Sequence, residues 1–591
     1  MGHRITSGWL ALGLAAMFLS ATGAFFLVLC RLPGITTCST QGFATLLVYH
    51  VDFAVLVWFL AMAGAFLSVT GPNGPLQGVA LLLAWGGAFA LLLAPAQGGA
   101  TPILANYFPV LANGLFLGGM VAMGAGTLLL VVDRLLQGSM VPGILAASLA
   151  LLCALIAFAV AALALPGPIG APQTFESLFW AGGHLLQNGH VLLLAALWLW
   201  LYRQEVPEFQ PPRFLGPLFM VALLPSVSGL FLDHTDPALH TQWMRWGSWW
   251  VVPGVVWVLV AEWRRKGWDT PYAWLSVLLL GVGLAMGTVV KEQTLLVPAH
   301  YHGTVGAVTL GYMGLARQLL ADPEEKSHTL DRWQPWLFAG GVLLLVVGLA
   351  VAGFSGLPRK TPGIEHAWEG AARLGMLLAG CGGLLSTASG LLFVVRQVPR
   401  WWRMQAGRSG GLLALTALAV AAIAAVIEIW PHPATVTTLS APAAPPQTEQ
   451  TELQRRFEQG AVMLHAKEYE HAMTAFHWVL KQAPKLPEAH VNMGFALLGL
   501  GRAKAAEDFF RGAIELNPYR ANAYYGLAQA LEEQKDLRGA LGAMRAFIHL
   551  TKAEDPFLPK ARSALWEWEN QLKTPPEESK APPEEPKTPT E

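Results

Sequence analysis

Long runs of apolar residues are the feature that most constrains this chain. About thirteen stretches of 18 or more mainly apolar residues follow one another up to residue 431. An α-helix needs roughly 20 such residues to cross the hydrocarbon core of a bilayer. Only 13% of the 591 residues are charged, whereas soluble proteins carry about 25%. The sequence therefore predicts an all-α, polytopic membrane protein.

The predicted spans have the approximate limits 7–30, 42–69, 76–96, 108–132, 143–165, 175–203, 213–234, 245–262, 271–290, 299–321, 335–356, 368–396 and 410–431. With a cytoplasmic N-terminus, fourteen Lys and Arg residues fall in inner loops and six in outer loops. The positive-inside rule favours this orientation. We expect a multi-pass protein of a bacterial inner membrane. Because the number of spans is odd, the residues after 431 are expected outside, in the periplasm.

Four cysteines are too few for a disulfide-rich scaffold, and no Cys-x-x-Cys-His motif for covalent haem attachment occurs. Cys30 and Cys38 lie close enough in the sequence to pair outside the membrane. The alternative is that both are free thiols.

Five histidines fall at one depth of the predicted bundle, near its outer face: His50, His184, His234, His300 and His302. Ionisable side chains at membrane depth are costly and usually mark a function. His300 and His302 are two residues apart, so they leave opposite sides of one helix. Neutral imidazole is a good ligand for iron and copper, and this helix could therefore ligate two separate cofactors.

These motifs resemble subunit I of the haem-copper oxidase superfamily. Residues 297–303 (VPAHYHG) resemble its tenth-helix His-aromatic-His signature, and residues 179–184 (FWAGGH) resemble the sixth-helix segment that carries a ligand of the second active-site metal. Residues 356–360 (GLPRK) resemble the loop between helices 11 and 12 whose cations hold haem propionates. The resemblance covers about residues 7–400. It implies a 12-helix oxidase core within 1–409, followed by one extra span at 410–431.

The resemblance also implies two haems. His50 and His302 would ligate a low-spin haem from its two sides. His300 would be the single ligand of a high-spin haem, whose other face is open to a gas. Arg359 and Lys360 would neutralise haem propionates.

A second active-site metal, copper or non-haem iron, is implied as well. His184 and His234 would hold it. The family usually has two adjacent histidines on its seventh helix, whereas this chain has Asp233 before His234. Asp233 or His240 is therefore the candidate third ligand, and a carboxylate would shift the preference towards iron.

Oxygen reductases of this superfamily use a redox-active tyrosine beside the second metal, on helix 6 or helix 7. Gln187 and Asn188 stand three and four positions after His184, and span 213–234 has no tyrosine. Gln187 and Asn188 are thus the polar candidates for catalytic contacts there. The sequence favours reduction of NO to N2O, with reduction of O2 to water by a cytochrome c oxidase-type enzyme as the alternative.

The residues after the last span have a different pattern. Residues 432–451 are rich in Pro, Ala and Thr, which is typical of a semi-rigid linker. A period of 34 residues then relates Gly460 to Gly494 and Ala472 to Ala506 and Ala540. This period is that of tetratricopeptide repeats, which predicts a soluble α-solenoid over 452–573. The Pro- and Glu-rich tail 574–591 is expected to be disordered.

Partners follow from these predictions. The chain has no cytochrome c domain of its own, so electrons would come from a periplasmic cytochrome c or cupredoxin. The repeats would dock partner subunits, lipids would surround the bundle, and no nucleic-acid partner is expected. Two readings of another class stay open: a haem-handling cytochrome c assembly factor, and a redox-inactive scaffold.

Overall fold

The computed structural model describes residues 2–31, 40–97, 101–138, 140–164, 172–232, 239–240, 243, 250–266, 271–290, 294–322, 328–355, 357, 359, 370–404, 447–551, 555 and 557–573. Several predicted features lie outside these residues: Cys38, Asp233, His234, Lys360, the extra span 410–431 and the tail 574–591.

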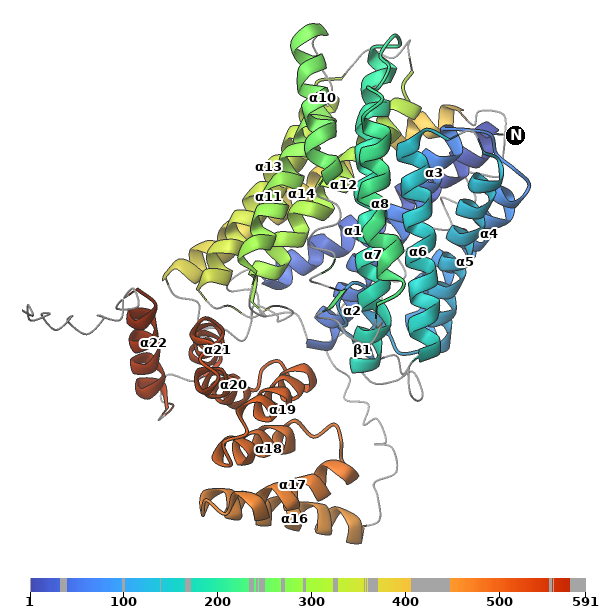
Figure 1. Ribbon diagram of the computed structural model, residues 1–591. Helices are drawn as coiled ribbons and strands as arrows, with labels where there is room; N and C mark the ends of the chain where they lie inside the picture. The colour runs from blue at the N-terminus through green and yellow to red at the C-terminus, as the bar shows by residue number, and fades with distance from the viewer. Residues whose placement is uncertain are drawn as a thin grey trace, which may run out of the picture. The chain divides into compact units, whose positions relative to one another are not determined.

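The chain forms two compact units, and almost all of the first precedes residue 438 (Figure 1). Its helices are α1 (Gly2–Arg31), α2 (Thr40–Val51), the π-helix η1 (Asp52–Val57), α3 (Trp58–Val69), α4 (Leu76–Leu93), the 3-10 helix η2 (Ala94–Gln97), α5 (Gly114–Leu136), α6 (Pro142–Ala164), α7 (Pro172–Glu205), α8 (Leu215–Gly229), α10 (Val251–Lys266), α11 (Pro271–Val289), α12 (Leu296–Leu319), α13 (Thr329–Phe354) and α14 (Gly370–Met404). Between η2 and α5, β1 (Pro102–Ile103) pairs antiparallel with β2 (Val110–Leu111).

Nine helices of the described residues are long and apolar enough to cross a membrane. Helix α8 is apolar but shorter than 18 residues. Helix α12 has 24 residues but is not among the nine, because polar residues, His300 and His302 included, lower its mean hydropathy. The expected helical membrane bundle is therefore present, while the count of twelve spans plus one stays a prediction.

The predicted second span is not a continuous α-helix. Helix α2 ends at Val51, one residue after His50, and η1 separates it from α3. A π-turn is a rare local widening that often accompanies functional sites. Asp52, the first residue of η1, is 1% exposed, and neither carboxylate oxygen has a hydrogen-bond partner within the described part of the chain. The sequence reading did not single out this residue.

Close backbone contact sets the position of α12 against α11. A Cβ atom on Gly283 of α11 would lie 2.5 Å from the backbone nitrogen of Thr304, and one on Gly303 would lie 2.5 Å from the Cα of Gly283. Only glycine permits this approach, since real Cβ atoms essentially never come so near another atom. The approach brings the histidine-bearing turn of α12 against α11.

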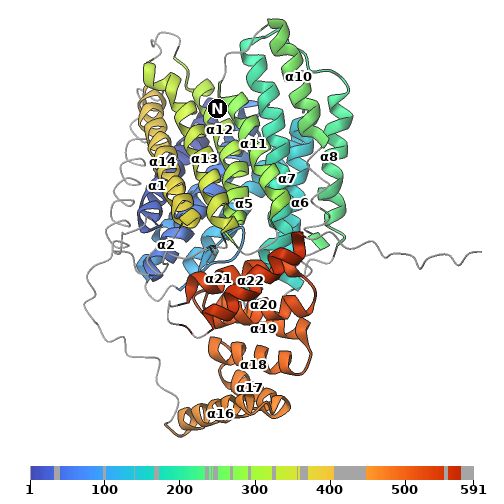
Figure 2. The same ribbon diagram turned by 90° about the vertical axis from the view of Figure 1, so that its left-hand side faces the viewer.

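The second unit contains residues 439–591. Its helices succeed one another in antiparallel pairs (Figure 2): α16 (Gln447–His465), α17 (Tyr469–Gln482), α18 (Pro487–Gly499), α19 (Ala503–Leu516), α20 (Ala521–Glu533), α21 (Leu537–Leu550) and α22 (Leu558–Lys573). Helix α16 begins inside the segment predicted as a linker.

Residues at equivalent positions of the 34-residue period pack in the same way. Gly460 lies against the ring of Phe476, and Gly494 lies against the ring of Phe510. Both rings and the periodic alanines Ala472, Ala506 and Ala540 are fully buried in one core. Helix pairs of this kind are what the period predicts, and the tetratricopeptide assignment stays a prediction.

Candidate functional site

Four of the five predicted ligand histidines are described, and all four are held in the same way through Nδ1. The partner in each case is a backbone carbonyl oxygen: Ser20 O for His50 at 3.1 Å, Trp180 O for His184 at 2.9 Å, Gly283 O for His300 at 2.7 Å and Pro298 O for His302 at 2.7 Å. A carbonyl oxygen can only accept a hydrogen bond. Nδ1 therefore carries the proton, and the lone pair of Nε2 remains for a metal, as is usual for metal-ligating histidines.

These four rings are also only half-buried, although they lie on helices whose neighbouring residues are largely buried. By contrast, His190 is 4% exposed. Partial exposure within a helical bundle means that space adjoins each ring. Rings of fixed orientation beside such space fit the binding of haem, which needs an apolar slot and an axial nitrogen.

The two residues predicted to share one haem lie close together. His50 and His302 are within range of electrostatic interaction, and Arg31 is within the same range of His302. Ser20 of α1 holds His50 a second time, with its hydroxyl 3.2 Å from Nδ1. The residues that the resemblance assigns to a low-spin haem thus come together from α2 and α12, with Ser20 and Arg31 of α1 beside them.

His300 lies on the α11 side of α12. Its Nδ1 bonds to Gly283, and a Cβ atom at Gly287 would lie 2.8 Å from the same nitrogen. The absence of a side chain at Gly287 therefore makes room for the imidazole. Since His302 bonds within its own helix instead, the two histidines serve different sides of α12, as the helix geometry predicts.

A tyrosine that the sequence reading missed contacts His184. Tyr107, between β1 and β2, places its hydroxyl oxygen 2.8 Å from His184 Nδ1. Its backbone has a φ of 65°, a conformation that costs a non-glycine residue free energy and often occurs at functional sites. A Cβ atom on Gly183 would lie 2.5 Å from the Tyr107 ring, so this position also needs glycine.

Tyr107 is protonated at neutral pH. Its burial, and secondly the negative charge of Glu176, raise the pKa of the phenol. Because the protonated Nδ1 of His184 has no lone pair to accept a hydrogen bond, the hydroxyl hydrogen of Tyr107 points elsewhere. No short-range sequence signal could have found this contact, since residues 107 and 184 are 77 positions apart.

The second metal site is described only in part. His240 is 1% exposed and lies within range of electrostatic interaction with His184. His240, a candidate for the third ligand, thus lies near His184 of α7. In the described ranges no group of three or more His, Cys, Asp or Glu side chains gathers to hold a metal ion. The pair therefore fits part of such a site, and the set with His234 and Asp233 stays a prediction.

Two arginines lie near Tyr301, the aromatic residue between His300 and His302. Arg359 and Arg31 both lie within range of electrostatic interaction with Tyr301. The resemblance implied propionate binding by Arg359. Arg31, at the end of α1, adds a second cation that the motif comparison did not include. Two cations beside the His50 and His302 pair suit the carboxylates of a haem edge.

Other polar residues of α7 have different surroundings. Asn188 is fully buried, and its amide nitrogen donates to Ala222 O at 3.1 Å and to Ser226 Oγ at 2.7 Å, both on α8. Gln187 is exposed. Their catalytic roles stay predictions. His190 bonds to Tyr312 Oη at 3.1 Å and packs on Phe59, which indicates a structural role.

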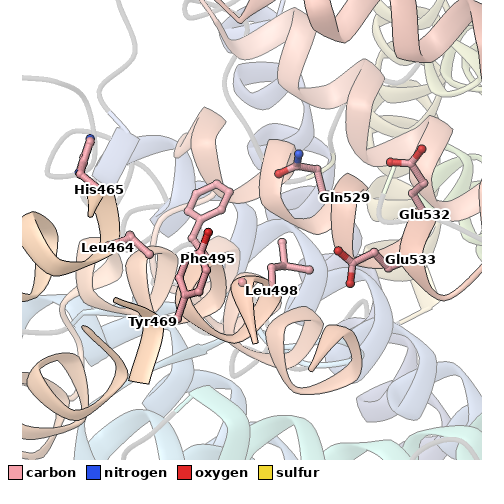
Figure 3. A pocket seen from close by; sticks show the side chains of 9 residues that line it. Leu464, His465, Tyr469, Phe495, Leu498, Gln529, Glu532 and Glu533 are labelled. Carbon is pink, nitrogen blue, oxygen red and sulfur yellow. The ribbon is translucent and has the colours of Figure 1, made fainter. Parts of the chain in front are cut away.

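The second unit has a pocket of its own, with a volume of about 460 Å³. Figure 3 shows the carboxylates of Glu532 and Glu533 on one side of it, with the rings of Tyr469 and Phe495 across from them. The indole nitrogen of Trp568 donates to Glu532 at 2.8 Å. This surface combines apolar side chains with negative charge.

Known proteins support the fold but not an activity. No family model matches the chain. An uncharacterized protein of Rickettsia prowazekii (strain Madrid E) is 23% identical over 491 residues, covering 66% of this chain and 95% of that protein. An uncharacterized protein of Aquifex aeolicus (strain VF5) is 26% identical over 329 residues, covering 53% of this chain and 84% of that protein.

A solved structure gives the clearest likeness. One chain of a heme-copper terminal oxidase dimer matches with a TM-score of 0.53 and 18% identity, covering 73% of this chain and 91% of that chain. The described bundle therefore shares the fold of that oxidase. The resemblance first noticed in short motifs is thus matched by the arrangement of the helices.

Proposed function

We propose that this protein is a membrane-integral terminal oxidoreductase of the haem-copper type. The observation that carries this proposal is the common state of His50, His184, His300 and His302, each with Nδ1 bonded to a carbonyl oxygen and Nε2 left for a metal. The fold that the bundle shares with a chain of a heme-copper terminal oxidase dimer supports it.

The residues have separate tasks. His50 and His302 hold a low-spin haem, and His300 holds a high-spin haem from the side of α11. Arg31 and Arg359 neutralise propionates. When bound, the haems and the second metal supply the iron and metal chemistry that transfers electrons and reduces a diatomic gas.

Tyr107 alters which gas we propose as the substrate. The preference for NO depended on the absence of a tyrosine beside the second metal on helix 6 or helix 7, whereas Tyr107 approaches from the β1–β2 loop, with its hydroxyl 2.8 Å from His184 Nδ1. A phenol at this position can provide the proton and electron that O–O cleavage needs, so we favour reduction of O2 to water. NO reduction remains the second candidate, because Asp233 stands where the family usually has a histidine.

The electron donor would be a periplasmic cytochrome c or cupredoxin that reaches the histidine end of the bundle. Cys30, at the end of α1 beside Arg31, is disulfide-bonded, and disulfides form mainly in oxidising compartments. This supports a periplasmic histidine end. The solenoid, also expected in the periplasm, would dock a partner subunit on the pocket of Figure 3.

Purified full-length protein gives the test. Haem content, optical spectra of the oxidised, reduced and CO-treated states, O2 uptake and N2O formation from NO should be measured on one preparation. The proposal expects two haems per chain, one of which binds CO, with O2 uptake exceeding N2O formation. A single transiently bound haem would favour the assembly factor, and protein without haem or metal would favour the redox-inactive scaffold.

A further inference from the structure

The opposite end of the bundle contains a second large cavity that the proposed reaction does not use. Its volume is about 990 Å³, and it lies among the ends of α7, α10, α11, α12 and α13. Arg317 of α12 lines it, about 22 Å along the helix from His302 at 1.5 Å per residue. Its charged lining residues are Arg317, Arg332, Asp331 and Glu205.

One of the two carboxylates that line this cavity is already paired with arginines outside the lining. Arg396 bonds to both carboxylate oxygens of Asp331, at 3.0 and 3.2 Å, and Arg400 bonds to it at 2.5 Å. Arg317 lies within range of electrostatic interaction with the same carboxylate. Because Arg396 and Arg400 already bind Asp331 from outside the lining, the charges that remain on the cavity wall are those of Arg317, Arg332 and Glu205.

The remaining lining is aromatic. Trp263, Trp274 and Trp336 all contribute to the wall. The rings of Trp263 and Trp274 are 6.0 Å apart, and Trp263 and Trp336 are 49% and 54% exposed. Tryptophan concentrates at the level of lipid headgroups, because its ring is amphipathic. Three tryptophans in one wall, two of them exposed, are what a cavity at the interface of a membrane is expected to have.

We propose that this cavity binds the phosphate-bearing headgroup of an anionic phospholipid. Arginine presents a planar set of donors that suits phosphate oxygens. Basic pockets between membrane helices on the cytoplasmic side are typical sites for anionic headgroups, and the positive-inside rule places Arg317 and Arg332 on that side. The exposed tryptophans border the path of the acyl chains.

The test uses the full-length protein in detergent. It is incubated with vesicles of phosphatidylcholine and phosphatidylglycerol, and the retained lipid is counted by native mass spectrometry. We expect selective retention of phosphatidylglycerol. In Arg317→Gln and Arg332→Gln, retention should weaken about fivefold for each substitution, because one cation near a membrane surface contributes about 1 kcal/mol.

Arg203→Gln is the matched control. Arg203 is exposed in the last turn of α7, at the same end of the bundle, and does not line the cavity. This variant should retain phosphatidylglycerol as the wild type does. The thermal unfolding midpoint, measured in parallel, shows whether each variant is folded.

Three outcomes would overturn the proposal. Equal retention of phosphatidylcholine and phosphatidylglycerol by the wild type would remove the charge argument. This measurement requires no substituted protein. Displacement of the lipid by an equal concentration of inorganic phosphate would identify a soluble phosphate as the ligand. A quinone that copurifies with the wild type and is lost in Arg317→Gln would show that the cavity serves a redox molecule.

Discussion

The bundle and the solenoid place their polar side chains in opposite ways. In the described bundle, Asp52, Arg134, Asn188, His190 and Arg400 are among the buried polar residues. In the described solenoid, Glu507 is the buried charged residue. The bundle instead exposes leucines and valines, such as Leu163 at 88%.

The difference follows from the solvent that each unit meets. Lipid cannot satisfy a polar group, so the bundle keeps such groups inside, where each must be paired or used. Water solvates polar groups, so the solenoid can leave them outside and fill its core with alanine, larger aliphatic and aromatic residues. A histidine ring that borders open space inside the bundle therefore points to function, whereas the buried residues of the solenoid contribute to stability.

The largest effect should come from removing a proposed haem ligand. His302→Ala is expected to abolish the low-spin haem signal and all gas reduction, because the Nε2 atom is lost. Optical spectra and haem content measure this. His190→Gln, a buried neighbour bonded to Tyr312, should keep both haems. Equal haem loss in the two variants would mean that buried histidines of the bundle act through stability, as residues of the solenoid do.

A smaller functional effect is expected at the loop tyrosine. Tyr107→Phe removes the hydroxyl 2.8 Å from His184 and keeps the ring that packs on Gly183. Loss of a group that orients a metal ligand costs about 10- to 100-fold in activity. Turnover with O2 should fall by that factor, while haem content and thermal stability stay as in the wild type. Unchanged turnover would remove the argument for O2.

In the solenoid, the expected effect is on stability alone. A Cβ atom at Gly526 would lie 2.2 Å from the Phe510 ring, so Gly526→Ala should destabilise the repeats by about 1–3 kcal/mol through overpacking. A Cβ atom at Gly512 would lie 3.4 Å from Nδ1 of His490, an ordinary contact distance. Gly512→Ala should therefore stabilise its helix by up to about 1 kcal/mol.

Hydrogen exchange of the full-length protein can measure both solenoid variants. Haem spectra should be unchanged in each. A change in the haem spectrum of Gly526→Ala would show that the two units are coupled and would break the separation drawn above.

The smallest effect is a pH dependence. Burial of Glu507 opposes its ionisation, but hydrogen bonds from Lys504, Gln534 and Arg511 outweigh burial and lower its pKa. A lowered pKa gives stability that is complete above the unfolded value, about 4.3, and is lost as the pH falls through the folded value. Acid titration of solenoid hydrogen exchange should show this loss, and Glu507→Gln should make it shallower. An identical acid response in the variant would contradict the assignment.

Much of the architecture could be predicted from the sequence, because it repeats or is local. Apolar runs predicted the bundle, a 34-residue period predicted the helix pairs, and two-residue spacing predicted that His300 and His302 serve different sides of α12. The π-turn after His50 could not be predicted, since residues 52–57 are as apolar as an ordinary span apart from Asp52.

The sequence by itself determined where the chain meets lipid and which residues can ligate metal, because hydropathy and side-chain chemistry belong to each residue. Only the tertiary structure decided which nitrogen of each imidazole is available, and which groups accompany it. Those properties depend on carbonyl oxygens, on the conformation of the β1–β2 loop and on close contacts at glycines. Several of these groups lie far from the histidines in the sequence. Tyr107 beside His184 shows the difference. The sequence gives the chemistry of its phenol, but only the structure shows that this phenol lies next to His184.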